Sequence, residues 1–125
     1  MALIFDAGAL IACERGNSSA IGLLNRAERT SLPIRTSAAV VAQVWRGGPR
    51  QALLARALSA AVEEPLDAER ARSIGALLGR AGRSDVVDAA VVDVAENGDV
   101  IVTADPYDIA ALVAASGRRV FVLPI

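Results

Sequence analysis

Three aspartates occupy positions at which a carboxylate can bind a cation and support catalysis. Asp6 follows the apolar run 2–5, Asp105 follows the apolar run 100–102, and Asp88 lies near the start of the helix predicted before the second run. In α/β sheets, ligands bind at the carboxyl ends of the strands, where all three residues can meet. Crowded carboxylates repel one another unless a cation lies between them. Clusters of oxygen ligands suit Mg²⁺ or Mn²⁺, which activate water and stabilise displacement at phosphorus.

Each of these aspartates also has a purely structural explanation. Asp6 and Asp105 both precede predicted helices, and aspartate is a frequent N-cap residue. Asp88 shares a helix face with Val91 and Val92, where a carboxylate is costly unless something pairs with it. The alternative is that Asp88 lies at the boundary of that face and reaches water.

The stretch 84–108 contains the elements that position two of the three aspartates. Ser84 is the predicted N-cap of a helix, and Asn97–Gly98 ends that helix with a turn. The apolar run 100–102 is typical of a strand that is buried on both faces of a parallel sheet. The next helix begins at Pro106, because proline is favoured at the first helical position.

Two further aspartates, Asp85 and Asp108, flank the three and are candidate accessory residues. Asp93, Glu96 and Asn97 lie on the other side of the first helix in this stretch and are expected to face solvent.

Strands and helices alternate along the whole chain, which favours a parallel sheet covered by helices on both faces. The sequence therefore predicts a three-layer α/β fold with a central sheet of four or five strands, formed by residues 1–125 as a single domain. The predicted strands are 2–5, 32–36, 100–102 and 120–123, with 62–66 as a short strand or an extended link. The predicted helices are 7–13, 18–29, 38–46, 50–61, 68–79 and 106–116, in addition to the helix that follows Ser84.

The composition excludes several classes of function. The 125 residues are 54% hydrophobic with a net charge of −1, which suits one compact domain without a global attraction for nucleic acid. The chain has no histidine, so histidine-based catalysis and histidine-ligated metals are excluded. It has no glycine-rich phosphate loop, no expected signal peptide and no apolar stretch long enough to span a membrane. The lone Cys13 cannot form an internal disulfide and fits a reducing cytoplasm.

Taken together, the segments resemble the PIN domain, and specifically the VapC-type toxins of bacterial toxin–antitoxin systems. The resemblance implies a sheet whose acidic cluster binds Mg²⁺ or Mn²⁺. It also implies a cytoplasmic endoribonuclease that cleaves RNA, is held inactive by a cognate antitoxin and forms a homodimer. The matching segments are 3–7, Thr36–Ser37 with 42–46, 85–89, and 102–106 with Asp108–Ile109.

The resemblance also implies roles for individual residues. Asp6, Asp88 and Asp105 match the metal-binding, catalytic aspartates. Asp85 is a candidate outer or alternate ligand, and Asp108 a candidate for orienting water. All 13 basic residues are arginine, which favours bidentate contacts to phosphate, and the scarcity of aromatic residues argues against base stacking as the main grip on RNA. The arginines expected to steer the RNA backbone are Arg46, Arg50, Arg80 and Arg83.

The chain departs from the family pattern at Gln43, where many members carry glutamate on the third helix. Glutamine keeps an acceptor oxygen but loses the charge and cannot act as a base, which weakens the case for a second metal. The alternative function is therefore a PIN-like binding module with weak or absent catalysis. A third possibility, a phospho-receiver-like domain, usually needs a lysine near the site, and this chain has none.

Overall fold

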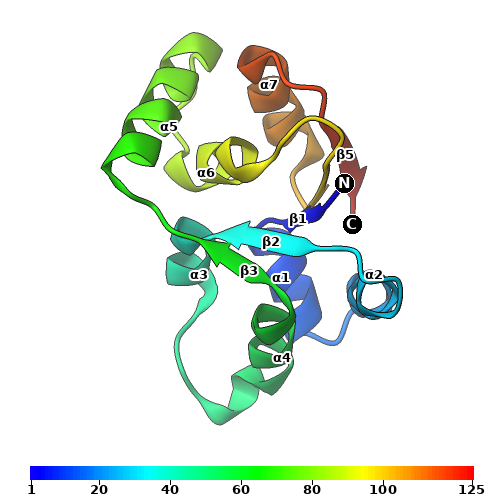
Figure 1. Ribbon diagram of the computed structural model, residues 1–125. Coiled ribbons are helices and arrows are strands. Elements are labelled where there is room, and N and C mark those ends of the chain that lie inside the picture. The colour runs from blue at the N-terminus through cyan, green and yellow to red at the C-terminus, as the bar shows by residue number, and fades with distance from the viewer.

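The computed structural model describes residues 1–125 and contains one five-stranded sheet in which every strand pairs in parallel. The strand order is β3-β2-β1-β4-β5, so the first strand of the chain lies at the centre (Figure 1). The strands are β1 (Leu3–Phe5), β2 (Ile34–Ser37), β3 (Val62–Glu64), β4 (Val100–Thr103) and β5 (Phe121–Pro124).

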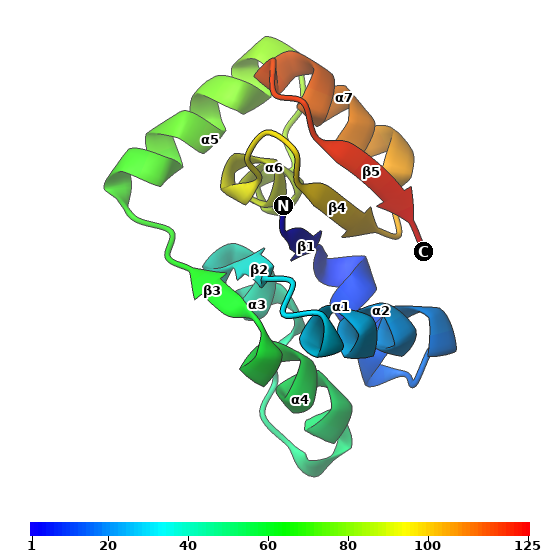
Figure 2. The same cartoon turned by 45° about the vertical axis from the view of Figure 1, so that its right-hand side comes forward.

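Helices cover both faces of this sheet (Figure 2). On one side α5, α6 and α7 pack against one another, and on the other side α1 packs against α2 and α4. The short helix α3 contacts both α1 and α6. The helices are α1 (Ala7–Glu14), α2 (Ser18–Arg29), α3 (Ala38–Val44), the 3₁₀ turn η1 (Pro49–Gln51), α4 (Ala52–Ala60), α5 (Ala68–Ala81), α6 (Val86–Val94) and α7 (Pro106–Ser116).

This architecture confirms the predicted three-layer α/β fold with a parallel sheet of five strands. The central strand β1 is buried along its whole length, as its continuous apolar sequence requires. The uncertain segment 62–66 forms a three-residue strand at the edge of the sheet. The predicted helix 50–61 begins with a 3₁₀ turn, in which Pro49 occupies the first position.

One surface prediction is wrong. Asp93 was expected to face solvent, yet its side chain is only 6% exposed. It accepts a hydrogen bond from Ser73 at 2.7 Å and pairs with Arg70 at 3.1 Å. These partners lie on α5, so the sequence of α6 alone gives no sign of them.

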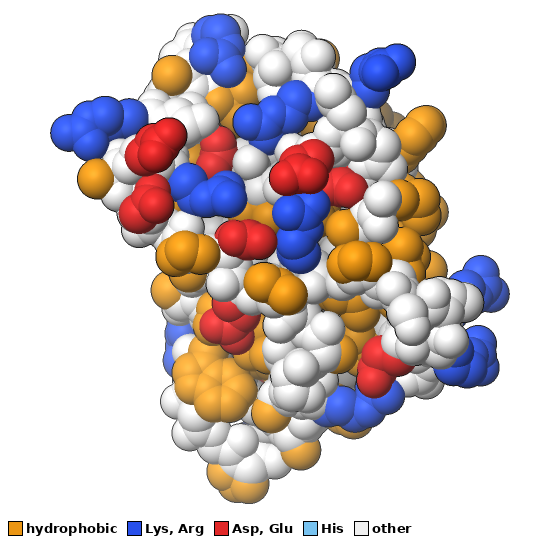
Figure 3. All heavy atoms as spheres, in the orientation of Figure 1, with side chains coloured by type: hydrophobic (Ala, Val, Ile, Leu, Met, Phe, Trp, Pro, Cys, Tyr) orange, Lys and Arg blue, Asp and Glu red, His pale blue; other side chains and the backbone are white.

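Charged side chains of both signs are interspersed over the upper half of the molecule (Figure 3), which fits the small net charge. None of the helices combines the length and the apolar composition that a membrane crossing requires.

Candidate metal centre

Asp6 lies directly after β1 and caps α1. Its Oδ1 accepts a hydrogen bond from the Ala9 N–H at 2.8 Å, and the residue is only 4% exposed. The possible capping role is therefore confirmed. It fixes the Asp6 carboxylate at the carboxyl end of the central strand, beside the start of α1.

Asp88 lies in the first turn of α6. The N-cap of this helix is Asp85 and not Ser84 as predicted, because the Asp85 Oδ1 accepts the Asp88 N–H at 3.0 Å. The Asp88 side chain is partly buried, and its carboxylate accepts no hydrogen bond from another residue. Its charge therefore lacks the compensation that a buried carboxylate normally needs.

Asp105 and Asp108 lie at the start of α7, just beyond β4. Asp105 occupies the N-cap position, but its side chain makes no capping hydrogen bond and stays exposed. Its own N–H donates to the Thr103 hydroxyl at 2.8 Å. Asp108 pairs with Arg83 through its Oδ1 at 2.6 Å. The Thr103 hydroxyl thus fixes the backbone of Asp105, and the Asp105 carboxylate stays exposed beside Asp108.

The structure brings Asp88, Asp105 and Asp108 together, and we call these three the acidic cluster. Each offers one carboxylate oxygen, and the three oxygens lie within 4.8 Å of one another. The trio expected from the sequence contained Asp6 in place of Asp108. Asp6 is buried nearby, where its charge acts on Asp88. Asp85 also contributes charge, although its Oδ1 caps α6.

The crowding changes the protonation of Asp88 and Asp6. Burial, followed by the charges of Asp85, Asp105, Asp6 and Asp108, raises the pKa of Asp88 from 3.8 to about 6. Burial also raises the pKa of Asp6, and hydrogen bonds from Thr103 and from two backbone N–H groups oppose that rise. Ionising either carboxylate therefore costs free energy, which a nearby positive charge would offset.

The pKa values of Asp105 and Asp108 are shifted in opposite directions. A hydrogen bond between their carboxyl groups raises the pKa of Asp105. The pKa of Asp108 is lowered first by its hydrogen bond with Arg83 and then by the one with Asp105. As the pH falls, Asp105 therefore takes up a proton before Asp108 does.

These observations fit a hard divalent cation. All the donors are carboxylate oxygens, which Mg²⁺ and Mn²⁺ prefer, and no nitrogen or sulfur ligand is present to favour Zn²⁺. A cation among them would offset the burial and the repulsion between carboxylates that raise the pKa values of Asp88 and Asp6. The residues available to hold it are Asp88, Asp105 and Asp108, with Asp6 beside them.

The other residues singled out in the sequence lie at different distances from this centre. Arg83 is part of it, because it pairs with Asp108 and lines a hollow of about 170 Å³ with Asp85 and Asp88. Arg80 donates to the carbonyl of Ala115. That carbonyl lies near the far end of α7, roughly 15 Å of helix from Asp105.

The third helix and the loop after it carry the remaining candidates. Gln43 is exposed on α3, and its side chain makes no hydrogen bond with another residue. Arg46 and Arg50 lie in the loop between α3 and α4, where they line a separate hollow of about 360 Å³. None of these three belongs to the acidic cluster.

Three residues that position the centre were not identified as site residues from the sequence. Thr103 orients Asp105, and the Thr36 hydroxyl donates to the Phe5 carbonyl at 2.8 Å, directly before Asp6. Gly8 lets α1 approach the segment after β4, since a Cβ at this position would lie 2.4 Å from the Cβ of Ala104. Two of these residues have a signal in the sequence. Thr103 lies two residues before Asp105, and Gly8 lies two residues after Asp6.

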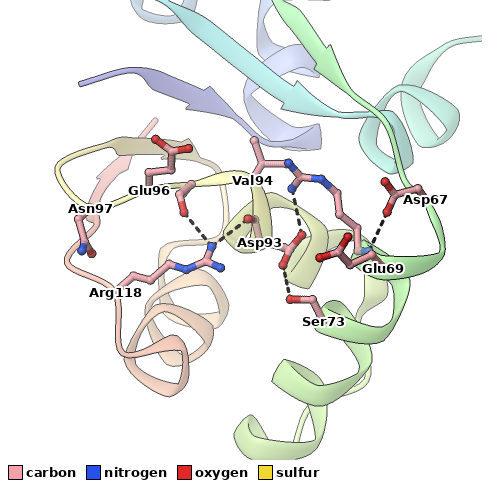
Figure 4. Close-up of a pocket in the computed structure, with 10 residues that line it drawn as sticks. Asp67, Glu69, Ser73, Asp93, Val94, Glu96, Asn97 and Arg118 are labelled. Carbon is pink, nitrogen blue, oxygen red and sulfur yellow. Dashed lines mark hydrogen bonds and ion pairs between the residues drawn. The ribbon is translucent and has the colours of Figure 1, made fainter.

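A hollow of about 640 Å³ lies elsewhere, between α5 and the carboxyl end of α6 (Figure 4). Several of its polar groups form hydrogen bonds and ion pairs with one another. Asp93 pairs with Arg70 and Ser73, and the Arg118 Nη1 donates to the carbonyls of Val92, Asp93 and Ala95 at 2.8–3.0 Å. This hollow is lined by a network that joins α5, α6 and the segment after α7.

Comparison of the chain with models of known protein families finds no match, and comparison with curated proteins finds none either.

Proposed function

We propose that this chain is a metal-dependent endoribonuclease of the PIN-domain type, similar to the VapC toxins. The observation that supports the proposal most is the acidic cluster. It combines three converging carboxylate oxygens, an Asp88 whose pKa is raised to about 6 and a position at the carboxyl edge of a parallel sheet. Perturbed carboxylates gathered at such an edge are typical of catalytic sites.

In this proposal Asp88 and Asp105 hold Mg²⁺ or Mn²⁺ together with Asp6 or Asp108. Such an ion, when bound, would neutralise charge on the scissile phosphate and lower the pKa of water. Arg83 lies at the rim of the cluster, 41% exposed, and can contact a phosphate oxygen of the RNA backbone. Arg83 has to leave Asp108 to do so, and a cation near Asp108 would weaken that ion pair.

The proposed partners are an RNA substrate, a cognate antitoxin that blocks the acidic cluster and a second copy of the chain in a homodimer. The proposed compartment is the cytoplasm, because the single cysteine is buried and has no second cysteine in the chain with which to form a disulfide.

The test is cleavage of a mixed structured RNA pool by pure protein, with Mg²⁺ or Mn²⁺ and with EDTA. Asp88→Asn and Asp105→Asn should each abolish metal-dependent cleavage while the fold is retained. Asp67→Asn is the matched control, because it also replaces an aspartate at the start of a helix, α5, but lies outside the cluster. Equal cleavage by Asp88→Asn and the parent chain would refute the assignment of the site.

One observation favours a second function, a binding module with little catalysis. Gln43 supplies no negative charge, and it is exposed on α3 without a partner. This function predicts no cleavage at any metal concentration and predicts that Gln43→Glu creates cleavage. If Gln43→Glu leaves a cleaving enzyme unchanged, the residue has no part in the reaction.

A further inference from the structure

The segment between α3 and α4 carries the only tryptophan of the chain, and we call residues 45–51 the Trp45 loop. Trp45 directly follows α3, and 43% of it is exposed. Gly47 has a φ of +74°, and a Cβ there would lie 3.5 Å from the Trp45 Nε1. The indole therefore rests beside the loop backbone while a large part of it stays in contact with solvent.

Gln51 holds this loop in one conformation. Its Oε1 accepts the backbone N–H groups of Arg46 at 2.9 Å and Gly47 at 3.0 Å. Its Nε2 donates to the Val44 carbonyl at 2.8 Å and to the Glu14 carboxylate at 2.6 Å. One side chain thus ties the loop to the end of α3 and to α1. A loop fixed in this way loses little entropy when it binds a ligand.

Two arginines of the loop have no acidic partner. Neither Arg46 nor Arg50 takes part in any of the ion pairs of the chain. Arg46 donates from Nη1 only to the backbone carbonyls of Ala42 and Trp45. Both arginines line the hollow of about 360 Å³, in which the one carboxylate, that of Glu14, accepts a hydrogen bond from Gln51.

We propose that the Trp45 loop binds single-stranded RNA, with one base stacked on the indole of Trp45 and the flanking phosphates held by Arg46 and Arg50. The inference rests on the proposed nuclease function and names the form of its substrate. Single-stranded nucleic acid combines a flat, unpaired base with a closely spaced negative backbone, which matches an exposed indole beside two guanidinium groups that have no acidic partner. A duplex keeps its bases stacked inside and cannot offer that face.

A membrane surface is the other anionic partner that an exposed tryptophan and two arginines can meet. Interfacial membrane binding needs an extended apolar face along a helix. The Trp45 loop offers one indole, two glycines and a proline in a compact turn, so the observations favour RNA.

The test uses the fluorescence of Trp45, which reports from this loop alone because the chain has no other tryptophan. The protein is titrated in EDTA, which prevents metal-dependent cleavage, with short oligouridine, with an RNA duplex of equal length and with an abasic strand of equal length. Stacking quenches indole emission, so oligouridine should quench strongly and the duplex and the abasic strand only weakly. A further titration with anionic phosphatidylglycerol vesicles tests whether the loop binds a membrane surface.

Variants of Trp45 test the same contact through the affinity for labelled oligouridine. Trp45→Ala should weaken binding roughly 5- to 150-fold, the range for the loss of one stacked base. Trp45→Phe should keep most of the affinity, which excludes a folding defect as the cause. Leu53→Ala is the matched control, because Leu53 is also 43% exposed but lies on α4 outside the loop.

Variants of the two arginines test the phosphate contacts. Arg46→Gln and Arg50→Gln should each reduce the dependence of log affinity on log salt by about 0.7, the value for one contact to a single strand. Arg72→Gln is the matched control and should leave it unchanged. Arg72, like Arg46, donates to the carbonyl four residues before it, but it lies on α5.

Several outcomes would overturn the inference. These are oligouridine binding without quenching, equal quenching by the abasic strand, and a blue shift on vesicles with no response to RNA. The nuclease proposal is scored separately by metal-dependent cleavage. Quenching without any cleavage would support the Trp45 loop as an RNA site and refute the nuclease proposal. Cleavage without quenching would support the nuclease proposal and refute RNA binding at the Trp45 loop.

Discussion

Replacing Asp88 by asparagine should make the metal-free protein more stable at neutral pH. In the folded chain burial and four neighbouring aspartates raise the pKa of Asp88 from 3.8 to about 6. Between these two pH values the folded state keeps a proton that the unfolded state has lost, so stability falls as the pH rises through this window. Above pH 6 the folded state bears the full cost of the ionised carboxylate.

The size of this cost follows from the two pKa values. At 1.36 kcal/mol per pKa unit, the difference sets an upper limit of about 3 kcal/mol. Asp88 is partly exposed, so solvent screening reduces the cost to about 1.5 kcal/mol. Asparagine also loses the favourable interaction of a carboxylate with the start of α6, about 0.5 kcal/mol. The expected net gain of Asp88→Asn is about 1 kcal/mol, or about 4 °C in Tm for a chain of this length.

The assay is thermal unfolding in EDTA at a series of pH values from below 4 to 8. Asp88→Asn should unfold at a higher temperature than the parent near neutral pH, and the difference should vanish at the acid end. Saturating Mg²⁺ should reverse the order, since an ion that binds only the folded parent at a hundred times its Kd adds about 2.7 kcal/mol. Asp67→Asn is the control and should follow the parent, because asparagine caps a helix as well as aspartate does.

Two results would refute this reasoning. If Asp88→Asn is no more stable than the parent at neutral pH in EDTA, the ionised Asp88 carboxylate does not destabilise the folded chain. If the gain persists unchanged at the acid end, ionisation is not its cause.

Three further substitutions test two residues near the metal centre and one, Arg118, in the separate network at the end of α6. Gly8→Ala should cost about 1–3 kcal/mol in urea unfolding and lower cleavage, because the added methyl meets the Cβ of Ala104 at 2.4 Å. Arg118→Met should cost about 2–3 kcal/mol in the same assay, since three carbonyls near the end of α6 lose a charged donor. Arg83→Gln should tighten Mg²⁺ binding, measured by calorimetry, and raise the KM for RNA, because Asp108 loses a competing cation and the substrate loses a phosphate contact.

The first two of these have a matched control. Gly22→Ala on α2 meets nothing within 4 Å and should stabilise the protein by about 0.5–1 kcal/mol. Arg119→Met removes a neighbouring arginine that is exposed, and should change stability by less than about 0.5 kcal/mol. Unchanged Mg²⁺ affinity in Arg83→Gln would show that the metal does not approach Asp108.

The arrangement of the sheet could be predicted from the sequence because its signals are local. The runs 2–5 and 100–102 are continuously apolar, and each is followed within three residues by an aspartate at the N-cap position of a helix. This pattern predicts a buried parallel strand whatever the rest of the chain does. The same reasoning placed Asp88 and Asp105 at one edge, where the structure has them.

The remaining details depend on contacts between distant segments. Asp93 is buried because of Arg70 and Ser73, twenty or more residues earlier in the chain. The inclusion of Asp108 in the acidic cluster did have a local signal, because residues three apart on a helix lie on the same face. Asp85 replaced Ser84 as the N-cap because both residue types cap well and only the path of the backbone decides between them.

The central position of β1 has a consequence for synthesis of the protein. This strand is synthesised before the other four strands of the sheet, but its partner β4 is synthesised only after β2 and β3, and the Ala2 N–H bonds to Asp99, 97 residues further along. Contacts of such long range form slowly and only after loop closure. A partly translated chain therefore cannot bring Asp105 and Asp108 to Asp88. Whatever activity the acidic cluster supports begins only after the segment that carries Asp108 has left the ribosome.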